Sequence, residues 1–236
     1  MKPLLVLAGG FGTRLRSIVN DVPKPLAPVN GSPFLKYLIK NWLRQGVREF
    51  IFLLHFEAEK IELMISKMQN SGELEDSKIH IIVEQEPLGT GGSVANAINL
   101  LGLDGRFLVA NADTWLDHGI TDLDKLGANS IAAVLVPDCK RYGSVSILDN
   151  KVVQFREKQS ESVAGWINAG LYCLDAKIFS AMSSVKAFSL EDSILPWCIE
   201  NSELKVFRME AQFVDIGVPS DYLRFCELTS KGNLRE

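Results

Sequence analysis

The sequence contains no long hydrophobic run and no excess of basic residues. Its 236 residues carry a formal net charge of −4, so the basic face that usually binds nucleic acid is not expected. No apolar stretch reaches the roughly 18 residues that cross a membrane. The N-terminal "MKPLLVLAGG" is too short and too rich in glycine for a signal peptide. We therefore expect a cytoplasmic protein that binds neither nucleic acid nor a membrane.

Cysteine and histidine are also scarce. Four cysteines are spread along the chain without a CxxC pair, which indicates reduced thiols in the cytoplasm. Three histidines, His55, His80 and His118, lack the spacing of metal ligands. We expect each of them to be structural or exposed.

Hydrophobic residues make up 47% of the sequence, enough for a substantial core. In the first half they form short strands that are apolar on both faces, as buried parallel strands are: 4–8, 50–54, 79–83 and 107–111. Helices are predicted between them at 33–46, capped by Ser32, and at 58–68 and 92–101. This alternation predicts an α/β fold, a three-layer doubly wound sheet that is mixed but mainly parallel.

The second half is richer in strands. Segments 131–136, 144–147, 152–155 and 167–174 follow closely, with "DN" at 149–150 as a hairpin turn, so added antiparallel strands are expected along one edge of the sheet. "SLED" at 189–192 predicts a capping box before a helix over 194–200. Strands at 206–209 and 213–214 and a helix over 220–230 complete the pattern. With no linker or repeat, we expect a single domain over 1–236.

The glycine-rich "GGFGTR" at 9–14 follows the first strand but fits neither common nucleotide-binding motif. The dinucleotide motif GxGxxG needs a third glycine where Leu15 stands, and the string GxxxxGK[ST] does not occur. A plain turn would explain the glycines alone. However, "VPKP" at 22–25 places Lys24 between stiff prolines. Backbone N–H groups with Arg14 and Lys24 would suit a polyphosphate.

These segments resemble the signature "LAGGFGTRL…PKPLAPV" of the sugar-phosphate nucleotidylyltransferases, which join a nucleoside triphosphate to a sugar 1-phosphate and release pyrophosphate. Further matching motifs follow in order: "EPLGTGG" (86–92), "NAD" (111–113), "RYGSV" (141–145), "FREK" (155–158), "INAG" (167–170) and "VDIG" (214–217). Segments 15–39 and 213–222 look closest to the D-glycero-D-manno-heptose 1-phosphate guanylyltransferases. The resemblance implies a Rossmann-like nucleotidyltransferase fold, with a nucleotide-binding half (1–115) and a sugar-phosphate-binding half (116–236).

The resemblance also implies the site residues. Three cations would be catalytic: Arg14, Lys24 and Lys158. The nucleotide would be bound by Leu7, Ala8, Gly9, Gly10, Gly12, Thr13, Glu84, Pro87, Gly89 and Thr90. The sugar phosphate would be bound by Asn111, Gly143, Glu157, Lys158, Asn168 and Gly170. No general base is needed, because the attacking phosphate is already ionised, and catalysis would consist of positioning and charge neutralisation.

A magnesium site is expected at Asp113 and Asp215. Asp113 directly follows an apolar strand, at the edge where parallel sheets bind ligands, and Mg²⁺ takes one or two carboxylates together with phosphate oxygens and water. Turn or capping aspartates are the alternative. The family usually has glycine before the first of these aspartates, whereas Ala112 stands here.

The nucleotide base is predicted from Glu84. Relatives place a base-reading side chain near this position, and a carboxylate suits the adjacent N1–H and N2–H donors of guanine, then the single amine of cytosine. Gln85 is adjacent, so a shift of one position would change this assignment.

We therefore expect a Mg²⁺-dependent transferase that joins GTP to D-glycero-D-manno-heptose 1-phosphate for lipopolysaccharide or capsule assembly. Alternatives are mannose 1-phosphate as the acceptor, or CTP with another phosphorylated small molecule. A regulatory subunit that binds nucleotide sugars without turnover is a third reading. The presence of the charged set Arg14, Lys24, Asp113, Lys158 and Asp215 argues against it. A homodimer is left open.

Overall fold

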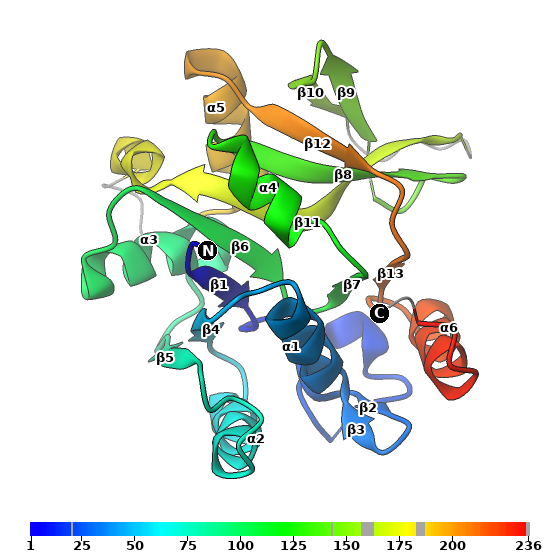
Figure 1. Ribbon diagram of the computed structural model, residues 1–236. Coiled ribbons are helices and arrows are strands. Elements are labelled where there is room, and N and C mark those ends of the chain that lie inside the picture. Colours follow the sequence, from blue (N-terminus) through cyan, green and yellow to red (C-terminus); the bar gives the residue numbers. More distant parts are fainter. Residues whose placement is uncertain (20, 143, 157–162, 183–186, 235–236) are drawn as a thin grey trace.

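The computed structural model describes residues 1–19, 21–142, 144–156, 163–182 and 187–234. A nine-stranded sheet in the order β5-β4-β1-β6-β11-β8-β12-β10-β9 runs through it, with helices on both faces (Figure 1). Of these strands, β11 and β10 run opposite to the others. The expected three-layer, mixed and mainly parallel α/β fold is confirmed. Among the described residues, no helix is long and apolar enough to span a bilayer.

The first half of the chain builds the parallel part of the sheet. Strand β1 pairs in parallel with β4 on one side and β6 on the other, and it is fully buried at Leu4, Leu5 and Val6. This explains why the strand is apolar on both faces. The elements are β1 (Leu4–Leu7), α1 (Phe34–Arg44), β4 (Glu49–Leu54), α2 (Ala58–Asn70), β5 (Lys78–Val83), α3 (Gly89–Leu101) and β6 (Arg106–Asn111).

The second half extends the sheet beyond β6. Antiparallel β11 pairs with β6, and β12 adds a parallel pair with β8. Asp149 and Asn150 both have positive φ (47° and 61°), as the predicted hairpin turn requires. The main-sheet strands are β8 (Ser130–Val136), β9 (Ser144–Leu148), β10 (Lys151–Arg156), β11 (Gly165–Asp175) and β12 (Lys205–Met209), and the helices are α4 (Ile120–Leu126), α5 (Leu195–Asn201) and α6 (Pro219–Ser230).

Two small antiparallel pairs lie beside the main sheet. β7 (Thr114–Leu116) pairs with β13 (Phe213–Asp215), and β2 (Pro28–Val29) pairs with β3 (Ser32–Pro33). The β2–β3 hairpin corrects one expectation. Ser32 and Pro33 belong to it, so Ser32 does not cap the following helix, which begins at Phe34.

The second correction concerns α3, which begins at Gly89 instead of residue 92. Glycines have low helix propensity, so the sequence predicts that the helix begins only at the last glycine of "GTGG". The backbone N–H groups of Gly91 and Gly92 both donate to the Phe188 carbonyl oxygen, at 2.9 and 3.1 Å. These tertiary contacts hold the glycines in the first turn.

The core is divided by the sheet into two layers. One cluster lies under α1, α2, α4 and α6 and includes Phe34, Trp115 and Phe225. The other lies under α3 and α5 and includes Phe107 and Tyr172. Both faces of β1 are therefore covered, and only the strand ends are free to carry a site.

Candidate active site

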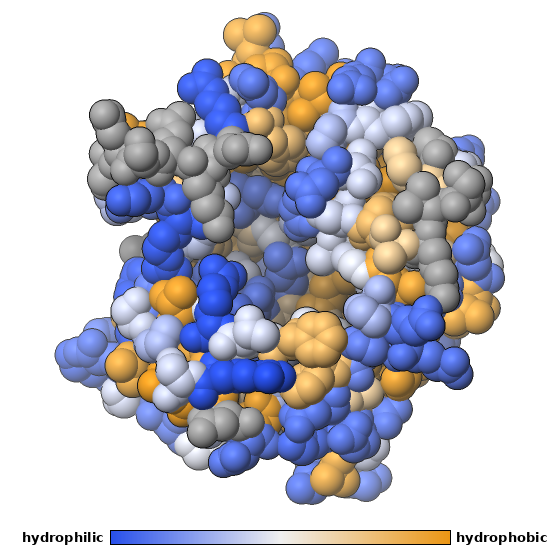
Figure 2. Space-filling model, turned by 180° about the vertical axis from the view of Figure 1, so that it is seen from behind, coloured by the Kyte–Doolittle hydropathy of each residue, from blue (hydrophilic) through white to orange (hydrophobic). Residues whose placement is uncertain are grey.

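A cleft of about 420 Å³ opens at the carboxyl ends of β1, β4 and β6. A hollow near the middle of the molecule is visible in Figure 2. The cleft is where the doubly wound topology predicts a ligand site. Of the residues predicted from the sequence, it is lined by Leu7, Ala8, Gly9, Gly10, Gly12, Thr13, Arg14, Lys24, Glu84, Pro87, Gly89, Thr90, Asn111 and Asp113.

The glycine loop and the "PKP" turn are packed against each other. Gly12 has φ +60°, and a Cβ placed there would lie 2.8 Å from the Cβ of Lys24. Lys24 begins a 3₁₀ turn whose residues Pro25 and Leu26 are buried. The two motifs are therefore one structural unit, and the missing side chain at Gly12 makes room for Lys24.

Replacing Gly12 with Ala tests this packing. Gly12→Ala should lower the free energy of unfolding by about 2–3 kcal/mol, because left-handed strain and a close contact add. Gly102→Ala is a matched control, since Gly102 also has φ +60° but its added Cβ would meet nothing within 4 Å. We expect the control to lose about 1 kcal/mol. Denaturant unfolding of both variants measures the difference, and equal losses would contradict the packing argument.

Two carboxylates face the ammonium group of Lys24. Its Nζ lies 2.6 Å from Asp113 Oδ2 and 3.6 Å from Asp215 Oδ1. The β7–β13 register, in which Asp215 pairs with Thr114, brings the two aspartates together. Burial and the nearby charge of Asp113 raise the pKa of Asp215, while Lys24 acts in the opposite direction. Positive charge is thus needed here for Asp215 to stay ionised beside Asp113.

The same pair fits a divalent cation. Among the described residues, no group of three or more His, Cys, Asp or Glu side chains converges as a metal site. Mg²⁺, however, needs only one or two protein carboxylates when phosphate oxygens and water complete its coordination. Asp113 and Asp215 meet that requirement because their oxygens already converge on one cation, the Lys24 ammonium.

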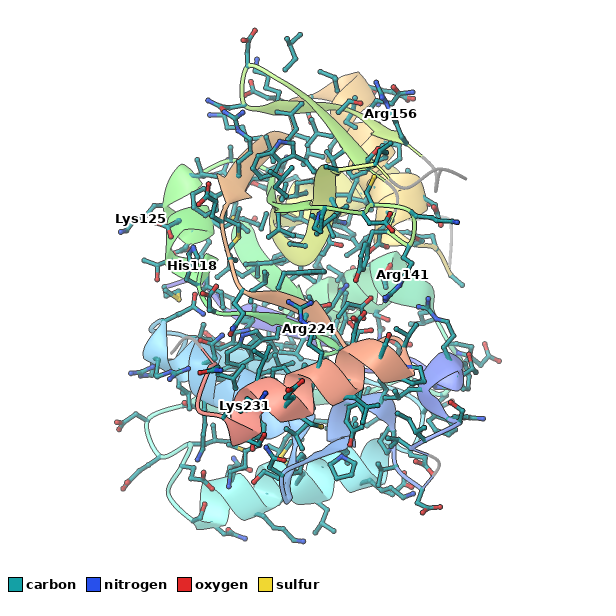
Figure 3. All side chains as sticks on the ribbon, turned by 90° about the vertical axis from the view of Figure 1, so that its right-hand side faces the viewer. His118, Lys125, Arg141, Arg156, Arg224 and Lys231 are labelled. Carbon is teal, nitrogen blue, oxygen red and sulfur yellow. The ribbon has the colours of Figure 1, made fainter. Side chains whose placement is uncertain are left out.

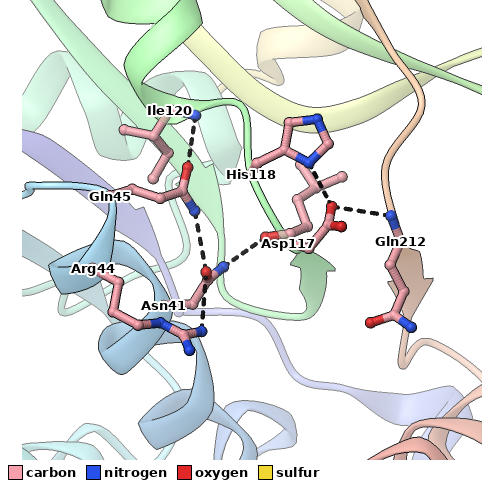
Figure 4. A network of polar contacts seen from close by, with 8 residues as sticks. Asn41, Arg44, Gln45, Asp117, His118, Ile120 and Gln212 are labelled. Carbon is pink, nitrogen blue, oxygen red and sulfur yellow. Dashed lines mark hydrogen bonds and ion pairs between the residues drawn. The ribbon is translucent and has the colours of Figure 1, made fainter. Parts of the chain in front are cut away.

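A polar network holds β7 and the start of β13 in place (Figure 4). Buried Asn41 of α1 donates from Nδ2 to the Leu116 carbonyl oxygen at 2.6 Å. Asp117 Oδ1 accepts from the Gln212 N–H at 3.0 Å and lies 2.8 Å from His118 Nδ1. Strand β7, which directly follows Asp113, and strand β13, which ends at Asp215, are therefore fixed to α1 and to each other.

Glu84 lies at the opposite side of the cleft and is 8% exposed. Its Oε2 accepts from the Leu88 N–H at 3.1 Å, which orients the carboxylate. Gln85 is exposed and does not line the cleft. The burial therefore favours Glu84 over Gln85 as the residue that faces a base.

An aromatic group beside Glu84 was not anticipated from the sequence. Phe11 and His55 line the cleft, with their rings edge to face at 5.6 Å, and His55 Nδ1 lies 2.9 Å from the Glu84 carbonyl oxygen. His55 directly follows β4, as Asp113 nearly follows β6. That shared position at a strand end is the signal that could have identified it.

Two predicted sugar-site residues, Asn168 and Gly170, lie at an irregularity in β11 beside Asn111 and are not among the described residues that line the cleft. Gly170 has φ +70°, and a Cβ there would lie 2.7 Å from Asn111 Nδ2. Its N–H donates to Asn168 Oδ1 at 3.1 Å. Asn111 Oδ1 is buried and has no hydrogen-bond partner among the described residues. The arrangement brings Asn111, Asn168 and Gly170 together and leaves Asn111 an acceptor for a ligand hydroxyl or water.

Three other predicted sugar-site residues, Gly143, Glu157 and Lys158, lie outside the described residues. The segments that lead to them are placed. Arg141 forms an ion pair with Asp221 of α6 at 2.7 Å, and β10 ends at Arg156. Figure 3 shows both arginines on the side of the molecule that carries α6.

Comparison with known proteins identifies the family. The sequence profile described as Nucleotidyl transferase matches residues 4–231. The chain belongs to this family.

This nucleotidyl transferase has relatives that match it over nearly their whole length. It is 34% identical over 223 residues to D-glycero-alpha-D-manno-heptose 1-phosphate guanylyltransferase of Campylobacter jejuni, covering 94% of this chain and 97% of the relative. It is 33% identical over 226 residues to the protein of that name from Aneurinibacillus thermoaerophilus, covering 92% and 94%.

Solved structures confirm the nucleotidyltransferase fold. The crystal structure of HddC from Yersinia pseudotuberculosis gives a TM-score of 0.84 at 35% identity, covering 97% of this chain and 100% of that chain. A second crystal structure of HddC, complexed with GMP-PN, gives a TM-score of 0.80 at 34% identity and covers the same shares.

Proposed function

We propose that the protein joins GTP to D-glycero-D-manno-heptose 1-phosphate, giving the GDP-sugar and pyrophosphate. A phosphate oxygen of the sugar phosphate attacks the α-phosphorus of GTP, the bond from that phosphorus to the bridging oxygen breaks, and pyrophosphate leaves with the bond electrons. The observation that carries the proposal is the single cleft lined by Arg14, Lys24 and Asp113, with Asp215 against Lys24. The guanylyltransferase relatives supply the substrate class.

The chain's part in this reaction is to bring two anions together. Backbone N–H groups of Gly9, Gly10 and Gly12, with Thr13, would bind the triphosphate next to Arg14 and Lys24. Asp113 and Asp215 would hold Mg²⁺, which when bound neutralises the negative charge of the phosphates. Lys158 would bind the sugar phosphate, and Gly143, Glu157, Asn168 and Gly170 would contact the sugar. Residues 1–115 would thus hold the nucleotide and residues 116–236 the sugar phosphate, with Asn111 of the first half also contacting the sugar phosphate.

The cellular context is also part of the proposal. Among the described residues, all four cysteines are free thiols: Cys139, Cys173 and Cys198 are buried, and Cys226 is partly buried. Reduced thiols suit a cytoplasmic enzyme. Its product would feed assembly of lipopolysaccharide or capsule.

Pyrophosphate release tests the reaction directly. GTP, CTP, UTP and ATP are each combined with D-glycero-D-manno-heptose 1-phosphate, mannose 1-phosphate and glucose 1-phosphate in the presence of Mg²⁺. We expect the highest kcat/KM with GTP and the heptose phosphate. If kcat/KM were highest with CTP or with mannose 1-phosphate, that compound would replace GTP or the heptose phosphate as the assigned substrate. If the protein bound a nucleotide sugar but released no pyrophosphate from any pair of triphosphate and sugar phosphate, the result would favour the regulatory subunit.

The base assignment is tested at Glu84. Glu84→Gln keeps an oxygen that can accept from the Leu88 N–H. It replaces the charged carboxylate, whose two oxygens would accept from guanine N1–H and N2–H, with an uncharged amide. A charged hydrogen bond contributes about 1.5–3 kcal/mol, so kcat/KM for GTP should fall roughly 10- to 100-fold. Gln85→Ala is the control, and its kcat/KM for GTP should not change. An unchanged ranking of the four nucleotides in Glu84→Gln would contradict the assignment.

A further inference from the structure

The first turn of α3, which lines the cleft, and β11, which carries the predicted sugar ligand Asn168, both contact one carboxylate. Thr90 Oγ1, which belongs to the cleft wall, donates to Glu191 Oε2 at 2.9 Å. Tyr172 Oη of β11 donates to the other oxygen, Glu191 Oε1, at 2.9 Å. Glu191 does not line the cleft, yet it contacts both Thr90 of the cleft wall and the buried Tyr172 of β11.

The sugar-side contact continues to a predicted ligand of the sugar. Asn168 Nδ2 donates to Tyr172 Oη at 2.9 Å, while Asn168 Oδ1 accepts the Gly170 N–H. Tyr172 is fully buried. Burial and the nearby charge of Glu191 raise the pKa of Tyr172 well above 10, so its hydroxyl remains a donor to Glu191. The direction of every hydrogen bond from Asn168 to Glu191 is therefore fixed.

The nucleotide-side contact is directed in the same way. The Leu190 N–H donates to Thr90 Oγ1 at 2.8 Å, so the hydroxyl hydrogen of Thr90 is left for Glu191. Ser189 Oγ adds a third hydroxyl donor to Glu191 Oε2 at 3.0 Å. The carboxylate thus collects three hydroxyl hydrogen bonds, which an uncharged amide at this position could not all accept.

The backbone just before Glu191 is hydrogen-bonded to the first turn of α3 and to Leu88, which precedes it. The Phe188 N–H donates to the Leu88 carbonyl oxygen at 3.0 Å, and the Phe188 carbonyl oxygen accepts from Gly91 and Gly92. A Cβ at Gly89 would lie 2.6 Å from the Phe188 carbonyl oxygen, and one at Gly91 would lie 2.4 Å from the Phe188 ring. These glycines allow residues 188–191 to pack directly on the first turn of α3, so a shift of one segment moves the other.

We propose that Glu191 is a positioning residue that sets the orientation of Thr90 for the nucleotide and, through Tyr172, of Asn168 for the sugar. It touches neither substrate. The inference rests on the proposed function, because it uses Thr90 and Asn168 as ligands of the two substrates. A hydrogen-bond network of this kind couples the residues at its two ends. Loss of the Glu191 carboxylate should therefore weaken binding of both the nucleotide and the sugar phosphate.

Three variants test the inference with two readouts. The readouts are the Kd of a non-hydrolysable GTP analogue with Mg²⁺, measured alone, and the KM of the heptose phosphate. Glu191→Gln should raise both constants about 5- to 50-fold. Tyr172→Phe, which keeps the ring in the core, should raise the KM of the heptose phosphate by a similar factor and leave the nucleotide Kd unchanged. Glu191→Gln combined with Tyr172→Phe should raise that KM no further than Glu191→Gln alone.

The control is Glu200→Gln, an exposed carboxylate on α5, which should change neither constant. Thermal unfolding of each variant separates a structural role from a positioning role. A lower Tm in Glu191→Gln with both constants unchanged would overturn the inference, as would additive effects on KM in the double variant. If Glu191→Gln does not fold, an unchanged KM in Tyr172→Phe overturns it. Failure of the wild-type protein to bind the analogue or to release pyrophosphate would instead overturn the proposed function.

Discussion

Replacing Asp113 with Asn should lower kcat by roughly a hundred- to a thousandfold, while the protein remains folded. Asp113 lies at the carboxyl end of β6, and its Oδ2 is 2.6 Å from Lys24 Nζ. The amide has nearly the same size and can still accept from Thr114 Oγ1, which donates to Asp113 Oδ1 at 3.1 Å. What it lacks is the negative charge that would hold Mg²⁺ among phosphate oxygens.

The measurement is pyrophosphate release at increasing Mg²⁺ concentration. Asp122→Asn, on the exposed face of α4, makes the same change of charge away from the cleft and should behave as the wild type. Because the Asp113 side chain is 36% exposed, we expect only a small change in the free energy of unfolding. A kcat within a few-fold of the wild type at saturating Mg²⁺ would exclude Asp113 as a metal ligand.

The parallel half of the fold could be predicted because its information is local. A helix lies between each of β1, β4 and β5 and the next strand of the parallel sheet, and such units have essentially one handedness. The order of the later strands could not be predicted. β12 inserts between β8 and β10 although it is distant from both in sequence. Nothing within Lys205–Met209 specifies that neighbour.

In the site, too, features set by local sequence could be predicted and features set by tertiary contacts could not. The glycine loop, the "PKP" turn and Asp113 could be placed in advance, because each stands at or near a strand end or in a recognisable motif. The place of His55 directly after β4 was a usable signal, but the packing of Phe11 and His55 on each other could not be predicted from their sequence neighbours. Glu191 looked like part of a helix cap, and Ser189 does cap that turn, accepting from the Asp192 N–H at 3.1 Å. The partners of Glu191, Thr90 and Tyr172, are distant in the sequence, so only the tertiary structure shows the contacts of Glu191.

Replacing Lys24 with Met should lower kcat/KM for the nucleotide roughly a hundred- to a thousandfold. The Lys24 side chain is only 10% exposed and carries the positive charge nearest to Asp113 and Asp215. Met fills similar space but cannot attract a triphosphate. The two carboxylates would also face each other without their counter-charge. We expect the free energy of unfolding to fall by about 1–3 kcal/mol, less than for a fully buried pair because Asp113 is partly exposed.

Lys2→Met provides the matched control for this change. Lys2 Nζ lies 2.6 Å from Asp124 Oδ1, the same separation as in the Lys24–Asp113 pair, and Lys2 does not line the cleft. The Lys2→Met variant should have a lower free energy of unfolding and an unchanged kcat/KM for the nucleotide. Mg²⁺ binding without nucleotide separates the two functions of the charge. Lys24→Met should bind Mg²⁺ at least as tightly as the wild type, because no ammonium competes for the carboxylates. Tight Mg²⁺ binding with near-normal turnover would show that Lys24 does not act on the triphosphate, whereas weaker Mg²⁺ binding would show that it helps to shape the aspartate pair.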